Sequence, residues 1–240
     1  MFIENFFNNT ISSTNNNTVS FTRQHGSDFA KQIADDFNPL HDIDAKRFCI
    51  PGDLLFSIIL AKAGLHQKME FIFSGMVTND IELNFPSEID GNAAIVDDKE
   101  KEYLRVSASG TKSTDEHLIE TLIRSYVEFS GHTFPHILVK LMHENNVMIN
   151  PTRPMVMYES MSIHLERLDL TEVKLVSSNS TLTLDGKRGK ACLEFDLVSN
   201  NEIVGHGKKH MLLSGLREYC QDNIDVIVND YNAKKANYLK

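Results

Sequence analysis

The pattern of apolar and polar residues predicts one buried helix early in the chain. Apolar side chains fill nearly every position of the run LLFSIILA at 54–61, so this helix has no polar face and is expected to be buried. Pro51 precedes the run and Gly64 follows it, which is the usual asymmetry between the two ends of a helix. We therefore expect a helix over residues 53–63. A shorter helix is expected over 28–33, with Ser27 as its N-cap.

Strand-like runs lie on both sides of this helix. A short alternating strand is expected at 19–22, and longer ones at 69–85, 103–109 and 117–129. A second helix is expected over 135–142, where Pro135 starts an apolar run. Four more strands are expected at 155–168, 173–184, 190–197 and 203–213.

The order of these elements repeats. Phe129-Ser130-Gly131 and Leu213-Ser214-Gly215 lie 84 residues apart, and Ile81-Glu82-Leu83 and Ile163-His164-Leu165 lie 82 apart. A helix followed by long strands, twice, indicates a duplicated α+β unit. The predicted architecture is a double hotdog, in which two antiparallel sheets each wrap a buried central helix. We expect a flexible Asn-rich segment at 1–18, a first unit at 19–131 and a second at 132–240.

One motif carries candidate chemistry. Asp36-Phe37-Asn38-Pro39-Leu40-His41 places a carboxylate and an imidazole five residues apart. Proline restricts its own φ and pushes the preceding residue out of helical geometry, so the segment is expected to be a stiff, bent loop. Such a pattern arises by chance in a chain of this length with a probability of about 10⁻⁴. Asp36 and His41 are therefore candidates for an acid/base pair that activates water, and the alternative is that they only cap a turn or a helix.

Composition narrows the classes of function. The formal net charge of −9 argues against a nucleic-acid surface, because phosphate contacts need clustered Lys and Arg. Short basic runs at 187–190 and 208–209 are either sites for a phosphorylated ligand or solvated turns and strand ends. Cys49, Cys192 and Cys220 are widely spaced and odd in number, so no disulfide or metal framework is expected.

No membrane or secretory signal is visible in the chain. The N-terminal segment lacks a basic region followed by a sustained apolar run, so no signal peptide is expected. No run approaches the roughly 18 apolar residues that a membrane span needs. These observations predict a cytoplasmic protein without a membrane partner.

The residues around the motif resemble a known family. Phe29-Ala30, the motif itself, Asp44-Ala45 and the segment from Phe48 to Pro51-Gly52 look like the MaoC-like dehydratases, which include the (R)-specific enoyl-CoA hydratases. Elsewhere the resemblance rests on the fold. It is also compatible with an uncharacterised bacterial family of that type.

This resemblance implies a hydro-lyase that hydrates or dehydrates an acyl thioester such as 2-enoyl-CoA or 3-hydroxyacyl-CoA. It assigns Asp36 and His41 to acid/base catalysis and the Gly52 backbone N–H to an oxyanion hole. Asn38 and Pro39 would support the loop. No metal or redox cofactor is implied, since CoA belongs to the substrate. The partner would be an acyl-CoA or an acyl-carrier thioester, and the chain a two-unit monomer or a homodimer.

Several departures from that family keep other functions open. Ala34-Asp35 stand where Ser or Thr followed by Gly is common, and Asp53 replaces an apolar residue. Asp35 either faces the site, where its charge raises the pKa of the neighbouring carboxyl, or points to solvent. Gly52 can also serve only to permit a tight helix entry. The alternatives are a non-catalytic acyl-thioester-binding or regulatory protein, and an acyl-CoA thioesterase.

The second unit lacks the motif and is expected to be degenerate. Gly131-His132-Thr133-Phe134-Pro135-His136 precedes its helix, without the Asp or the Asn-Pro turn. The pairs His132/His136 and His206/His210 share a spacing of four residues, but no Cys or carboxylate lies at ligand spacing beside them. No metal site is expected.

Overall fold

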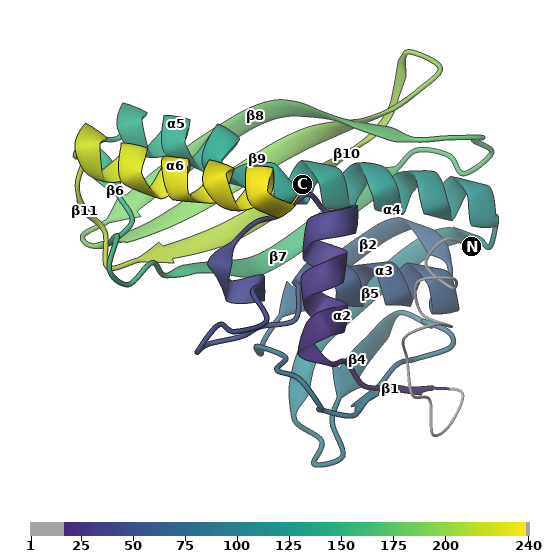
Figure 1. The fold of residues 1–240 in the computed structure, drawn as a ribbon. Helices are drawn as coiled ribbons and strands as arrows, with labels where there is room; N and C mark the ends of the chain where they lie inside the picture. The colour runs from purple at the N-terminus through teal and green to yellow at the C-terminus, as the bar shows by residue number, and fades with distance from the viewer. Residues whose placement is uncertain (1–16, 239–240) are drawn as a thin grey trace.

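A computed structural model describes residues 17–238 of the chain. Within that range one sheet of nine strands runs in the order β1-β3-β4-β5-β2-β7-β10-β9-β8, with every pairing antiparallel (Figure 1). The first-half strands are β1 Thr18–Val19, β2 Leu65–Phe73, β3 Leu83–Asn84, β4 Asn92–Val96 and β5 Glu102–Ser113. The second-half strands are β7 Val156–Leu165, β8 Lys174–Asp185, β9 Arg188–Ser199 and β10 Glu202–Ser214. A separate short pair joins β6 Val147–Met148 to β11 Arg217–Glu218.

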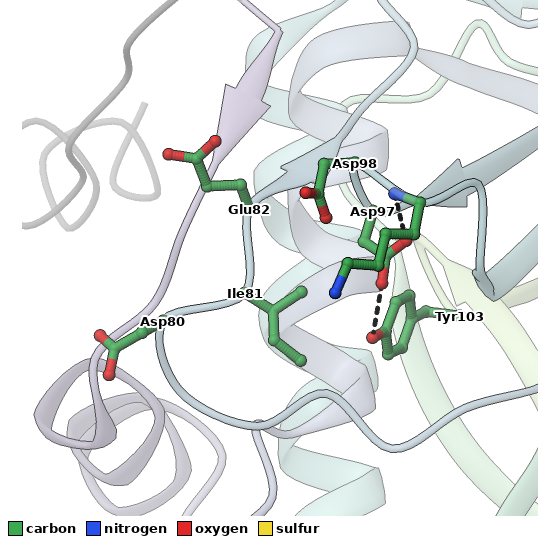
Figure 2. A pocket seen from close by; sticks show the side chains of 7 residues that line it. Asp80, Ile81, Glu82, Asp97, Asp98 and Tyr103 are labelled. Carbon is green, nitrogen blue, oxygen red and sulfur yellow. Dashed lines mark hydrogen bonds between the residues drawn. The ribbon is translucent and has the colours of Figure 1, made fainter.

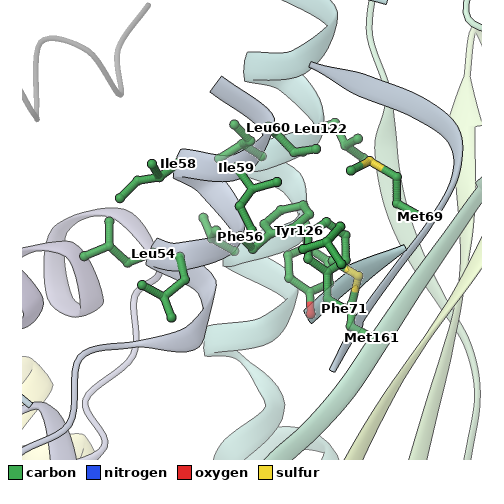
Figure 3. Packing of buried hydrophobic residues seen from close by; sticks show 14 of the residues in the cluster. Leu54, Phe56, Ile58, Ile59, Leu60, Met69, Phe71, Leu122, Tyr126 and Met161 are labelled. Atoms are coloured by element: carbon green, nitrogen blue, oxygen red, sulfur yellow. The ribbon is translucent and has the colours of Figure 1, made fainter. Parts of the chain in front are cut away.

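The buried helix is present where the sequence predicts it. Helix α3, Gly52–Ala63, has its apolar side chains almost fully enclosed by the sheet and by a neighbouring helix (Figure 3). Phe56 packs against Phe71 of β2 and against Tyr126, with ring centroids 5.1 and 4.7 Å apart. The buried hydroxyl of Ser57 in this helix donates to the Asp53 carbonyl at 2.7 Å, so it is paired.

The strand expected at 117–129 is wrong, because this segment is helix α4, Glu116–Gly131. Its buried residues follow a spacing of three and four, which is the helical period rather than the strand period. They are Leu118, Ile119, Leu122, Ile123, Tyr126 and Val127. Asp115 caps the helix by accepting from the Leu118 N–H at 2.8 Å.

Other boundaries also differ from expectation. Of the long strand expected at 69–85, only 69–73 lies in β2, which itself begins at Leu65; a loop and the short β3 follow. Thr22, not Ser27, caps the first helical segment, α2 Arg23–Asp28, which continues as a π-helical turn at Phe29–Ile33. The strands expected in the second half are confirmed as β7 to β10 with ends shifted by a few residues. The two tripeptide correspondences do not mark equivalent elements. Gly131 ends α4 whereas Gly215 follows β10, and Leu83 begins β3 whereas Leu165 ends β7.

Three helices lie along one face of the second half of the sheet (Figure 1). They are α4, α5 Leu138–Glu144 and α6 Gln221–Tyr238, and the sequence did not indicate the last of them. A second apolar cluster fills the space between α5, α6 and β8 to β10. The architecture is that of a double hotdog, with α3 against the first half of the sheet and α4 packed on β8 of the second.

The apolar interior is continuous across the middle of the chain. Strand β2 pairs with β7 from Lys68 to Ile72, and the main cluster includes Phe195 and Leu197 of β9 together with α3. The division at residue 131/132 stays a prediction, and α4 before it packs on β8 after it. The expected flexible segment at 1–18 lies almost wholly outside the described residues.

Candidate active site

The motif loop is held by its own polar side chains. The Asp36 Oδ1 atom accepts from the Asn38 N–H at 2.8 Å, and the Asn38 Oδ1 atom accepts from the Leu40 N–H at 3.1 Å. Pro39 then begins a 3₁₀ turn that includes His41. Such side-chain bonds to the backbone two residues on are the usual reason for Asp and Asn in tight turns. Asn38 and Pro39 therefore lie where a loop-supporting role would place them.

The structure brings Asp36 and His41 together. The His41 Nε2 atom lies 3.7 Å from the Asp36 Oδ2 atom, and both side chains are half-buried. The His41 Nδ1 atom lies 2.7 Å from the Cys49 carbonyl oxygen, which can only accept, so Nδ1 carries the proton in neutral imidazole. Nε2 is then the basic nitrogen and faces the carboxyl group, at a separation that one water molecule can bridge.

Burial changes the proton affinity of Asp36. Removal from water raises the pKa of this carboxyl above its ordinary value, while the nearby His41 acts in the opposite direction. A carboxyl with a raised pKa keeps its proton to higher pH, which is what a general acid requires.

Gly52 lies in the first turn of α3, immediately after Pro51. A Cβ atom at this position would lie 2.9 Å from the Phe73 ring and 3.2 Å from the Tyr158 ring, so a larger residue would be crowded. Its N–H belongs to the end of the helix that carries partial positive charge. The N-terminal turn of α3 can thus stabilise a developing oxyanion.

A buried polar chain adjoins this helix end, and the sequence reading missed it. The Lys209 ammonium of β10 donates to the Ser130 hydroxyl, which in turn donates to the Asp53 Oδ2 atom at 2.5 Å. Lys209 is 3% exposed and Asp53 is 8% exposed. The Tyr158 ring lies 4.4 Å from the Lys209 Nζ atom. The sequence signal that could have identified Lys209 is strand alternation, since side chains of β10 alternate between the two faces, with Lys208 exposed and Lys209 buried.

Asp35 does not share the environment of Asp36. Its Oδ2 atom is bonded to His132 Nε2 at 2.8 Å and to the Lys235 ammonium of α6. Burial raises the pKa of Asp35, but these two hydrogen bonds outweigh it and leave the pKa below its usual value. Asp35 also has a positive φ of 53°, a strained conformation for a residue with a side chain. Its role here is to tie the loop to α4 and α6.

Helix α6 covers the other side of the motif loop. The Tyr231 hydroxyl accepts from the Phe37 N–H and donates to the Asp35 carbonyl, both at 3.3 Å. Phe37 packs edge-on against the rings of Tyr231 and Tyr238. Lys234 of the same helix is bonded to Asp42 at 2.6 Å. A helix from the end of the chain therefore holds the loop in place.

The remaining candidates from the sequence are metal ligands, the basic runs and the cysteines. Residues 17–238 contain no cluster of three or more His, Cys, Asp or Glu side chains placed to hold a metal ion. Lys190 and Lys208 are paired with Glu159 and Glu194 on the exposed face of the sheet. Cys49, Cys192 and Cys220 are free thiols, and burial raises the pKa of Cys49 to about 11.

None of the helices within residues 17–238 is long and apolar enough to span a membrane.

Two surface recesses do not involve the motif. One of about 470 Å³ is lined by acidic side chains, including Asp97, which accepts from the Tyr103 hydroxyl (Figure 2). The other, of about 530 Å³, lies beside α4 and β8 and is lined in part by His132 and His136. Neither recess is lined by Asp36 or His41.

Comparison with known proteins assigns the chain to a family. The family described as "Protein of unknown function (DUF3581)" matches residues 1–222. The chain belongs to the DUF3581 family. The match ends just inside α6, so most of the helix that covers the motif loop lies beyond it. No curated protein matches this DUF3581 member.

Several solved structures resemble this DUF3581 protein at low identity. An acyl-CoA thioesterase II TesB2 from Mycobacterium marinum is 10% identical, with a TM-score of 0.43, covering 91% of this chain and 98% of its own. A conserved hot dog fold protein from Alicyclobacillus acidocaldarius is 7% identical, with a TM-score of 0.46, covering 85% and 95%. A bifunctional dehydratase-cyclase domain from ambruticin biosynthesis is 10% identical, with a TM-score of 0.37, covering 92% and 99%.

Proposed function

We propose that this protein is a hydro-lyase that adds water to, or removes it from, an acyl thioester such as 2-enoyl-CoA or 3-hydroxyacyl-CoA. The observation that carries the proposal is the pair Asp36 and His41, with Nε2 and Oδ2 3.7 Å apart on a braced loop. The resemblance of the motif to the MaoC-like dehydratases supports the same class of reaction. The substrate would be an acyl-CoA or an acyl-carrier thioester, and the reaction needs no metal or redox cofactor.

The two side chains would divide the proton transfers between them. In hydration, His41 Nε2 removes a proton from water as the water oxygen bonds to the β-carbon of the enoyl group. The alkene electron pair moves toward the α-carbon and the thioester oxygen, where the Gly52 N–H stabilises the charge. Asp36 then delivers a proton to the α-carbon, a role that the rise of its pKa on burial favours. The proton on His41 returns to Asp36 across the short gap between them.

The test follows the enoyl-thioester absorbance with crotonyl-CoA and with a longer 2-enoyl-CoA, in the presence of a thiol reagent. The proteins are the wild type, Asp36→Asn and His41→Ala. Asp44→Asn is the matched control, because Asp44 is an exposed carboxylate of the same loop. We expect absorbance loss without thiol release in the wild type and the control, and a loss of activity of about 10²-fold or more in the other two variants.

The other outcomes separate the rival functions. Thiol release would show a thioesterase, in which Asp36 directs water at the carbonyl carbon. No absorbance change and no thiol release, together with thermal stabilisation by acyl-CoA, would show a non-catalytic acyl-thioester-binding protein. Either result overturns the hydro-lyase proposal for these substrates.

A further inference from the structure

The second half of the chain contributes a buried cation to the candidate site. Lys209 comes from β10, in the half that lacks the motif, and bonds to Ser130 at the end of α4. Ser130 bonds to Asp53 in the first turn of α3, next to Gly52. Three elements that are distant in the sequence therefore meet in one hydrogen-bonded chain, which ends at the helix turn of the proposed oxyanion hole.

The end of α4 that carries this hydrogen-bonded chain also lies against the backbone of Asp36. The residue after Ser130 is Gly131, and a Cβ atom there would lie 3.3 Å from the Asp36 backbone nitrogen. Asp53 and the ammonium group of Lys209 are therefore buried beside the motif loop, within range of charge interaction with the Asp36 carboxyl. A buried charge is tolerated when an opposite charge and hydrogen bonds compensate it. One cation compensates one of the two carboxylates, so the other is free to carry a proton.

We propose that Lys209 is a positioning residue of this site, which compensates the Asp53 carboxylate through Ser130 and thereby sets the proton affinity of Asp36. This inference rests on the proposed function in one respect only, which is that the proposed reaction makes Asp36 a proton donor. It assigns the second half an electrostatic role in a site whose motif lies wholly in the first half.

The electrostatic environment of Asp36 agrees with this assignment. Burial raises the pKa of Asp36, the charge of Asp53 raises it further, and the charges of His41 and Lys209 lower it. Burial lowers the pKa of Lys209, and the charges of Asp53 and Asp36 oppose that effect. The Tyr231 hydroxyl of α6 also faces this region, and its pKa is raised to about 12 by burial, so it remains neutral.

The neighbouring carboxylate, Asp35, has its own ion-pair partners. Asp35 is paired with His132 of the segment after α4 and with Lys235 of α6. Its charge is compensated by these two partners rather than by Lys209.

The experiment measures the titration of the Asp36 carboxyl directly by ¹³C NMR, with Asp36→Asn to assign the signal. Lys209→Met removes the cation and should raise the Asp36 midpoint by about one pH unit or more, a tenfold change in proton affinity. Asp53→Asn removes the like charge with little change of shape and should lower the midpoint. Lys208→Met is the control: this neighbour is exposed and paired with Glu194 at 2.8 Å, and its replacement should leave the midpoint unchanged.

The result is decisive in each case. Should Lys209→Met fail to fold, the downward shift in Asp53→Asn supports the proposal and its absence overturns it. The double variant, in which both charges are removed, should return the midpoint toward the wild-type value. An unchanged midpoint in both single variants overturns the proposal. No substrate is used in this titration, so its result does not depend on whether the protein acts on any thioester.

Discussion

Gly131 at the end of α4 lies directly against the Ala34 carbonyl oxygen of the motif loop. A Cβ atom at position 131 would be 1.7 Å from that oxygen, and a backbone atom cannot rotate away as a side chain can. Glycine is therefore required here by close approach rather than by conformation. The contact sets how near the loop carrying Asp36 lies to α4.

Gly131→Ala should push the motif loop away from α4. We expect a loss of unfolding free energy of about 1–3 kcal/mol, the usual cost of overpacking, together with loss of catalytic activity. Urea unfolding and the absorbance assay measure the two effects. Gly186→Ala is the control: nothing lies within 4 Å of its Cβ position, but its φ is +56°, so it should cost about 1 kcal/mol and leave activity intact. Equal effects of both substitutions on activity would contradict the close-contact argument.

Tyr231→Phe should loosen the motif loop without creating a cavity beside it. The change removes the hydroxyl that bonds to Phe37 and Asp35 and keeps the ring. We expect a stability loss of about 0.5–1.5 kcal/mol and a fall in kcat of about tenfold or more, because small misplacements of catalytic groups are costly. Tyr219→Phe, which loses an exposed hydrogen bond to Gln221, is the control. A kcat equal to that of the control would show that α6 does not position the loop.

The contact between α6 and the loop should weaken in acid. Burial raises the pKa of Asp42, but its bonds to Lys234 and Lys31 outweigh this and hold the pKa below the usual 3.8; Asp35 behaves in the same way. A lowered native pKa contributes stability that is present above pH 3.8 and disappears as the pH falls through the native value. The stability difference between wild type and Asp42→Asn, measured by urea unfolding, should therefore be largest near neutral pH and shrink below pH 4. A difference that is independent of pH would exclude this ion pair as its source.

Cys49 should be a poor nucleophile despite its place beside the motif. Its pKa is raised by burial from 9.0 to about 11, so the thiolate fraction near neutral pH is about a hundredfold lower than for an unperturbed thiol. Alkylation by iodoacetamide, followed by mass spectrometry, should be slower by about that factor in native protein than in urea. Cys49→Ala should retain activity. Rapid alkylation of the native protein, or inactivity of the Cys49→Ala variant, would contradict this prediction.

Local sequence determined the parts of this protein that depend on near neighbours. Pro51 and Gly64 predict the helix at 53–63, and Asn38-Pro39 predicts the bend of the motif loop. Both can be predicted because these signals act within a few residues. The strands of the second half followed from alternation for the same reason. The segment at 117–129 is a helix instead of the predicted strand, because a short apolar run is ambiguous between the two periods and the cap that marks the helix, Asp115, lies outside that run.

Tertiary structure decided which side chains complete the site. Ser130 and Asp53 are 77 residues apart and Lys209 and Ser130 are 79 apart. They meet because α4 packs on α3 and because its Tyr126 contacts Tyr158 of β7, the strand beside β10. Local pattern marks Lys209 only as one of two adjacent lysines; whether it is buried depends on which face of β10 the rest of the chain covers. The sequence by itself determined the motif loop and the helix that follows it. The charges around them were decided by long-range packing, since burial and compensation are properties of the folded interior.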